Sequence, residues 1–429
     1  MMRIYRSADI DETWLAARRA IAHDPKIEAA VAEIIAGVRR EGDAALRQYG
    51  ERFSGVRLDQ FRVSEQELTA AEQAVDKNFL AIMRQAADNI RLYHTSQLRQ
   101  DIVIEREPGI VLGQRFTPIE RVGVYVPGGT AAYPSSVLMN AIPAVLAGCR
   151  RIAMTTPPQS DGSVAPDILA AARIAGVNEI YKLGGAQAIA ALAYGTESVP
   201  RVDKIVGPGN IYVATAKKQV FGQVAIDMVA GPSEILIIAD EQADPACLAA
   251  DLLSQAEHDE RAVAILICLS REKAQAVIAE LALRLPPLPR RKIAESSLSR
   301  QGAIIIAPGL AKAVQLANAI APEHLELSVD EPFALLPRIE HAGSVFLGAY
   351  TPEPLGDYWA GPNHVLPTGG LARCFGPLSV DDFLKRSSYI CYSRQALAAA
   401  APAVIAFAEH EGLTAHANSI RARVGEDRQ

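Results

Sequence analysis

The fold is decided by the stretch RVGVYVPGGTAAYPSSVLMNAIPAVLAGC, residues 121–149. Its apolar residues 122–126 predict a buried strand, which the turn 127–129 ends. Residues 135–147 then predict a helix, and Gly148 stops it. A buried strand, a glycine-rich turn and a helix in this order are typical of a parallel sheet, because parallel strands are apolar along their length.

The same alternation of strand and helix continues along the chain. Further strands are predicted at 151–155, 179–183, 204–206, 234–239, 263–268, 303–306, 325–327 and 344–347. They fall into two series, 122–240 and 235–350. We therefore expect an α/β fold with two incomplete Rossmann-like, doubly wound parallel-sheet domains and helical arms at both ends.

Four segments are expected along the chain. Residues 1–121 form a helical arm and a hairpin and in part complete the second α/β domain; 122–234 and 235–375 form the first and second domains; 376–429 form a helical tail that packs on a partner subunit. The arm contains an amphipathic helix over 27–50, a helix that starts with an S-x-x-E capping box at Ser64, and a hairpin of 102–107 with 110–117.

The composition excludes several classes of protein. Hydrophobic residues make up 49% of the 429 residues and charged residues 21%, which excludes a disordered chain. The 43 basic and 49 acidic residues give a net charge of −6 without a basic block, so no nucleic-acid partner is expected. We expect neither a membrane segment nor a signal peptide. Five scattered cysteines without a C-x-x-C pair indicate reduced thiols and a cytoplasmic protein.

Three glycine-rich turns follow predicted strands: PGGT at 127–130, LGGAQ at 183–187 and GPGN at 207–210. In open parallel sheets, ligands bind beyond the carboxyl ends of the strands, and glycine lets backbone N–H groups approach a phosphate. The turns therefore favour a nucleotide site. None is a full G-x-G-x-x-G, and glycine also makes ordinary tight turns, so spacing alone leaves both interpretations open.

Two pairs of residues can do metal or acid–base chemistry. Gln255 and His258 share a face at the end of a predicted helix, where they bind a metal or belong to a solvated acidic helix end. Glu323 and His324 precede a strand, where they supply two acid–base groups or form a surface turn. The residues alone do not decide between these alternatives.

Two further segments stand out near the end of the chain. Asp357 lies in a Pro/Gly-rich loop, 350–364, where it is either a turn cap or a ligand or catalytic carboxylate. The segment EGLTAH, 411–416, indicates by itself only the start of a helix.

Taken together, these segments resemble the histidinol dehydrogenase family over nearly the whole chain. The stretches that carry the resemblance are RVGVYVPGG at 121–129, GGAQA at 184–188, GPGN at 207–210, AGPSEI at 230–235, SQAEH at 254–258, PEHLE at 322–326, GPNHVLPTGG at 361–370 and LSVDDF at 378–383. Each is weak alone, and eight in this order are highly specific.

The resemblance implies an enzyme that oxidises L-histidinol through L-histidinaldehyde to L-histidine, the last steps of histidine biosynthesis, with one zinc ion per subunit and two NAD+ per turnover. It implies zinc ligands at Gln255, His258, Asp357 and His416. The implied substrate contacts are these four with Ser233, His324 and Glu411, and the implied NAD contacts are Tyr125, Gln187 and Asn210. It also implies a homodimer in which the tail crosses to the partner and the site is shared.

The chemistry of the reaction suggests roles for the pair Glu323 and His324. His324 is the expected general base, because neutral imidazole has a suitable pKa near 7. Glu323 is expected to activate the water that hydrates the aldehyde, and the metal is expected to orient the substrate. A thiol route through Cys149 is the competing mechanism, although an Ala-Gly-Cys segment between a helix and a strand indicates a packed small residue.

Three other functions compete with this interpretation. A related zinc/NAD dehydrogenase would act on another small polar alcohol, such as a sulfonated diol, but Glu411 favours a cationic or N–H donor group. A metallohydrolase would have no use for three nucleotide-type turns. A non-catalytic, metal-stabilised dimer is disfavoured by the pair Glu323 and His324.

Overall fold

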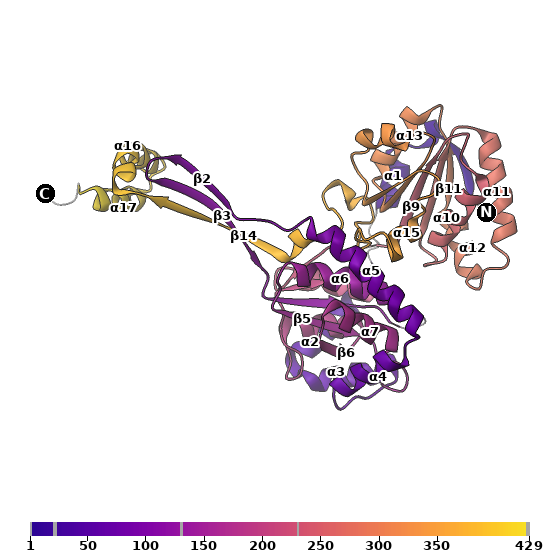
Figure 1. The fold of residues 1–429 in the computed structure, drawn as a ribbon, viewed down its shortest axis with the longest axis horizontal. Coiled ribbons are helices and arrows are strands. Elements are labelled where there is room, and N and C mark those ends of the chain that lie inside the picture. The colour runs from indigo at the N-terminus through magenta and orange to yellow at the C-terminus, as the bar shows by residue number, and fades with distance from the viewer. Residues whose placement is uncertain (1, 20–23, 129–131, 230, 426–429) are drawn as a thin grey trace. The chain divides into compact units, whose positions relative to one another are not determined.

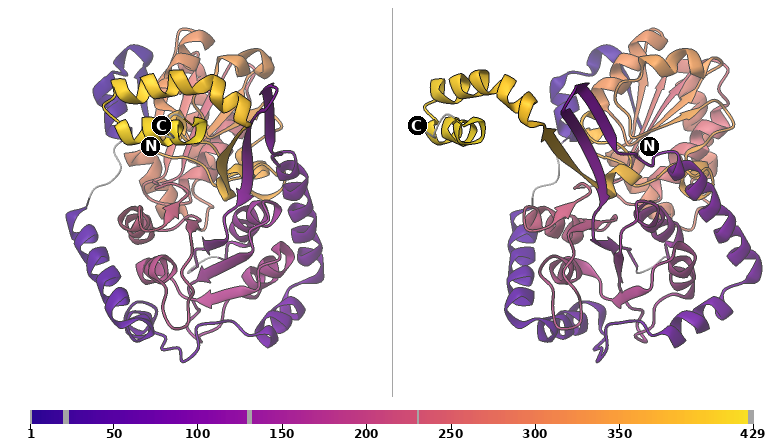
Figure 2. Two further views of the ribbon diagram at one scale, coloured as in Figure 1. Left: turned by 90° about the vertical axis from the view of Figure 1, so that its left-hand side faces the viewer. Right: turned by 60° about the vertical axis from the view of Figure 1, so that its left-hand side comes forward.

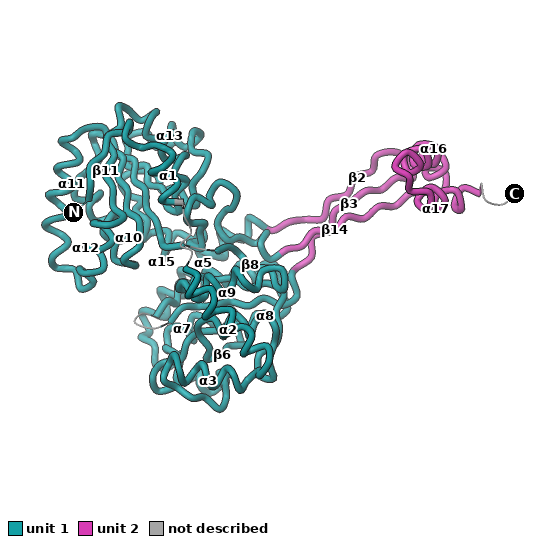
Figure 3. Tube along the Cα trace, turned by 180° about the vertical axis from the view of Figure 1, so that it is seen from behind, with its two compact units in different colours: residues 1–97, 119–383 teal, residues 98–118, 384–429 magenta. Residues whose placement is uncertain are grey.

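The computed structural model describes residues 2–19, 24–128, 132–229 and 231–425. The chain divides into two compact units, each made of segments far apart in the sequence. Unit 1 combines Met1–Gln97 with Ile119–Phe383, and unit 2 combines Leu98–Pro118 with Leu384–Gln429 (Figure 3). Two parallel sheets belong to unit 1 and one antiparallel sheet to unit 2.

The first sheet of unit 1 has the strand order β6-β5-β4-β7-β8, and all its strands are parallel. Its strands are β4 (Arg121–Tyr125), β5 (Arg151–Thr156), β6 (Glu179–Lys182), β7 (Lys204–Val206) and β8 (Ala225–Ile226), and its helices are α6 (Pro134–Leu146), α7 (Pro166–Ala175), α8 (Gly185–Tyr194) and α9 (Ile211–Val220). From the central strand β4, the chain first adds β5 and β6 on one side and then β7 and β8 on the other. The switch point therefore lies between β4 and β7, at the carboxyl ends where the predicted glycine turns follow.

Helix α2 (Pro25–Glu41) packs on this first sheet; of the N-terminal arm, which we expected to complete the second domain in part, Arg3–Arg6 and Glu12–Arg19 lie on the second sheet. The apolar stripe of α2, including Val31 and Ile34, enters the same buried core as Ile189 of α8 and Val213 of α9. Helix α2 thus buries its apolar stripe against α8 and α9. Figure 2 shows the N-terminal helices around the sheet.

The single helix expected over 27–50 is broken at Gly42. This residue has a φ of +53°, and a Cβ there would lie 2.4 Å from a carboxylate oxygen of Glu197. The chain turns at this point and continues as α3 (Asp43–Ser54), followed by α4 (Glu65–Ala74) and α5 (Lys77–Thr95). The predicted capping box is confirmed, because Ser64 and Glu67 bond each other's backbone N–H groups at the start of α4.

The second sheet of unit 1 has the order β1-β11-β10-β9-β12-β13 and is also parallel. Its strands are β1 (Arg3–Arg6), β9 (Glu234–Ala239), β10 (Val263–Cys268), β11 (Ala303–Ile306), β12 (His324–Ser328) and β13 (Ser344–Leu347). Its helices are α1 (Glu12–Arg19), α10 (Pro245–Ala256), α11 (Arg271–Arg284), α12 (Arg291–Arg300), α13 (Leu310–Ile320), α14 (Pro332–Leu335) and α15 (Glu353–Tyr358).

One apolar core lies on each face of this second sheet. Helices α10, α11 and α12 cover one face, and α1 and α13 cover the other (Figure 1). Helices on both faces of two doubly wound parallel sheets confirm the predicted Rossmann-like α/β class. No helix within the described ranges is long and apolar enough to cross a membrane.

Unit 2 is a three-stranded antiparallel sheet with two helices. The predicted hairpin is confirmed as β2 (Ile102–Glu107) and β3 (Ile110–Pro118), and the helices are α16 (Arg394–His410) and α17 (Thr414–Val424). We expected the tail to be helical throughout. It is not, because β14 (Leu384–Tyr392) pairs with β3 over nine residues. The free edge of β3 supplies the backbone partners, and the tyrosines and isoleucine of β14 favour a strand.

Candidate active site

The pair Glu323 and His324 lies at the amino edge of the second sheet. His324 is the first residue of β12, which runs between β9 and β13, next to the switch point of this sheet. Its register partners are Ile235 on β9 and Ser344 on β13. The position is opposite to the carboxyl edge at which open α/β sheets usually bind ligands. Both side chains are buried, so this is not the surface turn that the sequence left open.

The backbone of Glu234 holds both members of the pair. Its N–H donates to Oε2 of Glu323 at 2.7 Å, and its carbonyl accepts from Nδ1 of His324 at 2.9 Å. A carbonyl can only accept, so Nδ1 carries the proton of a neutral ring and Nε2 has a free lone pair. Nε2 is buried and has no hydrogen-bond partner among the described residues.

Burial sets the protonation of this pair. It lowers the pKa of His324 to about 4, against the opposing field of Asp357; this is below the value near 7 that we expected, and the imidazole is neutral near pH 7. It raises the pKa of Glu323 well above its ordinary value, and the neighbouring carboxylates of Glu234 and Asp357 raise it further. The site therefore combines a neutral imidazole with a carboxyl group of high proton affinity.

Two carboxyl groups on α15 complete a cluster around His324. Oε1 of Glu353 lies 3.9 Å from Nε2 of His324, and ligand atoms of His324, Glu353 and Asp357 lie within 4.8 Å of one another, a spacing that can hold a metal ion. Burial opposes ionisation of Asp357, but the hydrogen bond with His364 and the fields of His364, His324 and His258 together outweigh it and lower the pKa of Asp357 to about 2. Burial and the adjacent Asp357 raise the pKa of Glu353 to about 9.

The predicted zinc ligands of unit 1 lie on two elements. Gln255 is in the last turn of α10, is 1% exposed, and its Oε1 has no hydrogen-bond partner in the described part of the chain. His258 follows the helix end, is exposed, and acts electrostatically on Asp357 and His324. His258 therefore lies near enough to Asp357 and His324 to interact with both electrostatically.

The other predicted contacts are placed as follows. Ser233 is half-buried directly before β9, where its carbonyl accepts from the N–H of Val263. Glu411 and His416 belong to unit 2, Glu411 as the C-cap of α16 and His416 in the first turn of α17, and both are exposed in that unit.

The predicted NAD contacts lie at the carboxyl ends of the first sheet. Tyr125 ends β4, is buried, and its hydroxyl accepts from the N–H of Gly185 at 3.1 Å. Gln187 is buried in the first turn of α8. Asn210 is the exposed N-cap of α9. Gly129 and Thr130 of the first predicted turn, and Ala230 of the segment AGPSEI, lie outside the described residues.

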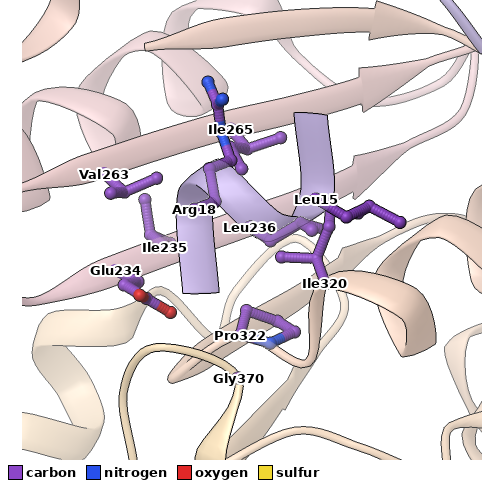
Figure 4. Close-up of a pocket in the computed structure, with 10 residues that line it drawn as sticks. All are labelled: Leu15, Arg18, Glu234, Ile235, Leu236, Val263, Ile265, Ile320, Pro322 and Gly370. Atoms are coloured by element: carbon purple, nitrogen blue, oxygen red, sulfur yellow. The ribbon is translucent and has the colours of Figure 1, made fainter. Parts of the chain in front are cut away.

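Two hollows adjoin the cluster. A cavity of about 110 Å³ is lined by His324, Asp357, His364, Phe346 and neighbouring residues of the loop that follows β13. A smaller pocket lies between Arg18 on α1 and Glu234, above Pro322 (Figure 4). Burial raises the pKa of Glu234 to about 7, against the hydrogen bond from the N–H of Gly369.

Sequence reasoning missed three carboxyl groups of the site. Glu234 lies in an apolar strand, as does Glu326, whose Oε1 accepts from the N–H of Glu353 at 2.9 Å; Glu353 lies in the loop that drew attention only through Asp357. The signal that could have found the first two is a buried charged residue in an apolar parallel strand, which needs a partner. The thiol route has no support here, because burial raises the pKa of Cys149 to about 11.

The fold and the site define a class: an α/β protein with glycine-rich turns on one Rossmann-like sheet and a buried acid–base cluster on the other. The family model described as histidinol dehydrogenase matches residues 17–424. The chain therefore belongs to the histidinol dehydrogenase family, and it is a dehydrogenase.

Relatives resemble the chain along most of its length. It is 57% identical over 395 residues to the histidinol dehydrogenase of Geobacillus kaustophilus, covering 92% of this chain and 93% of that protein. It is 56% identical over 397 residues to that of Bacillus cereus, covering 92% of each. The crystal structure of histidinol dehydrogenase from Elizabethkingia anophelis superposes with a TM-score of 0.94 at 37% identity, covering 100% of this chain and 99% of that one.

Proposed function

We propose that this enzyme oxidises L-histidinol through L-histidinaldehyde to L-histidine, with two NAD+ per turnover and one zinc ion per site. The observation that carries the proposal is Nε2 of His324, which is buried, lacks a hydrogen-bond partner within the described ranges, and belongs to a side chain that lines a cavity. A neutral imidazole nitrogen in that position is suited to accept the proton of a substrate hydroxyl.

The donors around Asp357 fit a zinc ion. The buried Oε1 of Gln255 lacks a partner among the described residues, and a cation would supply the missing interaction. The low pKa of Asp357 keeps its carboxylate ionised, as a metal ligand must be. We propose Gln255, His258 and Asp357 as ligands, together with His416 of the partner subunit. When bound, the zinc ion orients the substrate through the imidazole and amine of histidinol.

His324 and Glu323 have different roles in the two oxidations. In the first, His324 accepts the hydroxyl proton at Nε2 while the hydride leaves for the nicotinamide, and it releases this proton to water before the second oxidation. Glu323, in its ionised form, then removes a proton from the water that adds to the aldehyde; its raised pKa makes this carboxylate a stronger base than an ordinary glutamate, and the proton it gains returns to water before the next turnover. In the second oxidation His324 accepts the proton of the hydrate as the second hydride leaves. The backbone carbonyl of Glu234 fixes the Nδ1–H tautomer of His324, so Nε2 is the nitrogen that accepts the proton in both oxidations.

We propose that NAD+ binds at the carboxyl ends of the first sheet, in contact with Tyr125, Gln187 and Asn210. The support is the switch point between β4 and β7 and the start of two helices there, α8 and α9, whose N–H groups favour a phosphate. The hydroxyl of Tyr125 holds the N–H of Gly185 at the beginning of α8.

We propose a homodimer in which unit 2 packs on a second copy of the chain. Unit 2 carries exposed apolar side chains on its sheet and helices, among them Ile390 at 73% exposure and Phe407 at 70%. Such side chains indicate a surface that another protein covers. The packing would bring Glu411 and His416 to the partner's site, where Glu411 is the proposed contact to the substrate.

The test is NADH production with L-histidinol, counted as equivalents per substrate. We expect two equivalents from the wild type, almost none from H324A, and close to one from E323A, which completes the first oxidation and is slow in the second. H341A, which changes a histidine outside the site, is the control and keeps two. Activity with a sulfonated diol but none with histidinol would overturn the substrate, and equal losses in both steps would overturn the division of roles.

A further inference from the structure

The turn after β7 is built on a glycine that no other residue can replace. Gly207 follows Val206 directly and has a φ of +115°. A Cβ at this position would lie 2.1 Å from the backbone oxygen of Tyr125, at the end of the neighbouring strand β4. The backbone of Gly207 therefore touches the end of β4, at the switch point of the first sheet.

Both polar backbone groups of Gly207 are held by one buried ion pair. The N–H donates to Oδ2 of Asp227 at 2.8 Å, and the carbonyl accepts from Nζ of Lys217 at 2.9 Å. Lys217 and Asp227 also pair with each other, and their side chains are only 4% and 1% exposed. The other carboxylate oxygen, Oδ1, accepts from the N–H of Met228 at 2.6 Å.

Three elements meet at this pair. Asp227 comes directly after β8, whose register with β7 places it beside the end of that strand. Lys217 lies in the second turn of α9, the helix that Asn210 caps. The ion pair thus joins the ends of β7 and β8 to α9. The turn 207–210 is the segment between the end of β7 and the start of α9.

We propose that Lys217 and Asp227 are positioning residues for the dinucleotide: they hold the turn 207–210 in the shape that NAD+ meets. The inference rests on the proposed NAD site. Neither side chain reaches solvent, so the pair acts through the backbone of Gly207 and through α9. A buried ion pair gains little stability over apolar side chains, whereas it can fix both groups of one peptide at once. That function accounts for two charges in an otherwise apolar core.

The experiment compares D227N with the wild-type enzyme and with K204M. Lys204 forms another largely buried pair in the same domain, with Asp382, but does not touch the turn. We expect the KM for NAD+ of D227N to rise about tenfold, because a small misplacement of a binding group is costly. The KM for histidinol and the zinc content stay within twofold. K204M keeps all three, and NADH fluorescence titration shows the same loss of affinity in D227N alone.

A double variant separates positioning from a structural role. K217M/D227L leaves no lone charge in the core, so it also serves if D227N fails to fold. If the ion pair only stabilises the fold, this variant regains the wild-type KM for NAD+, and that result would overturn the proposal. Positioning predicts a KM that stays raised, because both groups of Gly207 remain unheld.

The wild-type enzyme provides a test that needs no variant. Hydrogen exchange at the N–H of Gly207 is expected to be slow even without nucleotide, because Asp227 already accepts it; fast exchange would overturn the proposal. A wild type that binds no NADH would contradict the proposed function itself. Normal NADH affinity in the wild type and in every folded variant would overturn only the role of the pair.

Discussion

Replacing Gln255 with methionine is expected to have opposite effects on stability with and without zinc. The side chain is 1% exposed and its Oε1 has no hydrogen-bond partner in the described ranges, so the metal-free protein contains a desolvated oxygen. Such a group costs about 1–3 kcal/mol. Methionine has a similar length and no polar oxygen, so Q255M removes this cost without opening a cavity. We expect the metal-free variant to be about 1–2 kcal/mol more stable than the wild type.

Zinc reverses this order if Gln255 is a ligand. At a free zinc concentration of 100 times its Kd, the wild type gains about 2.7 kcal/mol of unfolding free energy. The variant, with a Kd raised about a hundredfold, gains about 0.4 kcal/mol at the same concentration. Urea unfolding with a chelator and then with buffered zinc measures both values, and chelator competition measures the Kd.

A second buried amide serves as the control for Q255M. Asn140 is also fully buried, and its Oδ1 likewise lacks a partner among the described residues, but it lies on α6 in the first domain. N140L is expected to leave the zinc affinity unchanged. A metal-free Q255M that is less stable than the wild type, or one that binds zinc as tightly, would refute the reasoning.

Three further outcomes follow from the structure. E234A is expected to lose about 1–3 kcal/mol of stability, because the N–H of Gly369 loses its acceptor, and to keep most of its kcat, because the backbone groups of residue 234 still hold the catalytic pair. E234Q keeps an acceptor, and urea unfolding that finds E234Q as unstable as E234A would contradict this. Burial opposes ionisation of Glu67, but its hydrogen bonds from Lys182 and Ser64 and the charge of Lys182 together prevail and lower the pKa of Glu67. The Glu67 carboxylate therefore stabilises the fold above the ordinary pKa of glutamate and loses this effect as the pH falls through the lowered pKa. The difference in unfolding free energy between wild type and E67Q is at most about 1 kcal/mol for this partly exposed pair, and it is expected to shrink when urea unfolding is repeated at acid pH. A difference that stays constant with pH would refute the assignment. Dialysis against a chelator is expected to abolish both NADH equivalents, and re-addition of zinc to restore them; full activity of the metal-free enzyme would remove the metal from the proposal.

Local sequence patterns predicted most of the strands in unit 1. Buried parallel strands are continuous apolar runs, so β11 and β13 were predicted to the residue. β1 and β14 were not predicted, because their partners β11 and β3 lie far away in the sequence and the runs RIYR and LKRSSYICY are polar enough to resemble loops or arms. The break at Gly42 was missed because the apolar stripe continues across it.

The candidate site shows the same division. The residues alone left Gln255 and the pair Glu323 and His324 open between chemistry and ordinary structure, and only the resemblance to a family favoured chemistry. The structure added Glu234, whose contacts to the pair arise from the pairing of β9 with β12. It also added Glu353, which the short helix α15 brings to His324.

The sequence by itself determined the α/β class, the two sheets and the identity of the side chains that can do chemistry, because hydropathy, glycine and capping signals act within a few residues. Only the tertiary structure decided which carboxyl groups surround His324, which nitrogen of its ring is free, and which buried charges hold Gly207. Those properties depend on burial and on hydrogen bonds between distant segments, such as Glu234 with Glu323. Burial and long-range bonding are set by how the strands assemble, and no local pattern encodes them.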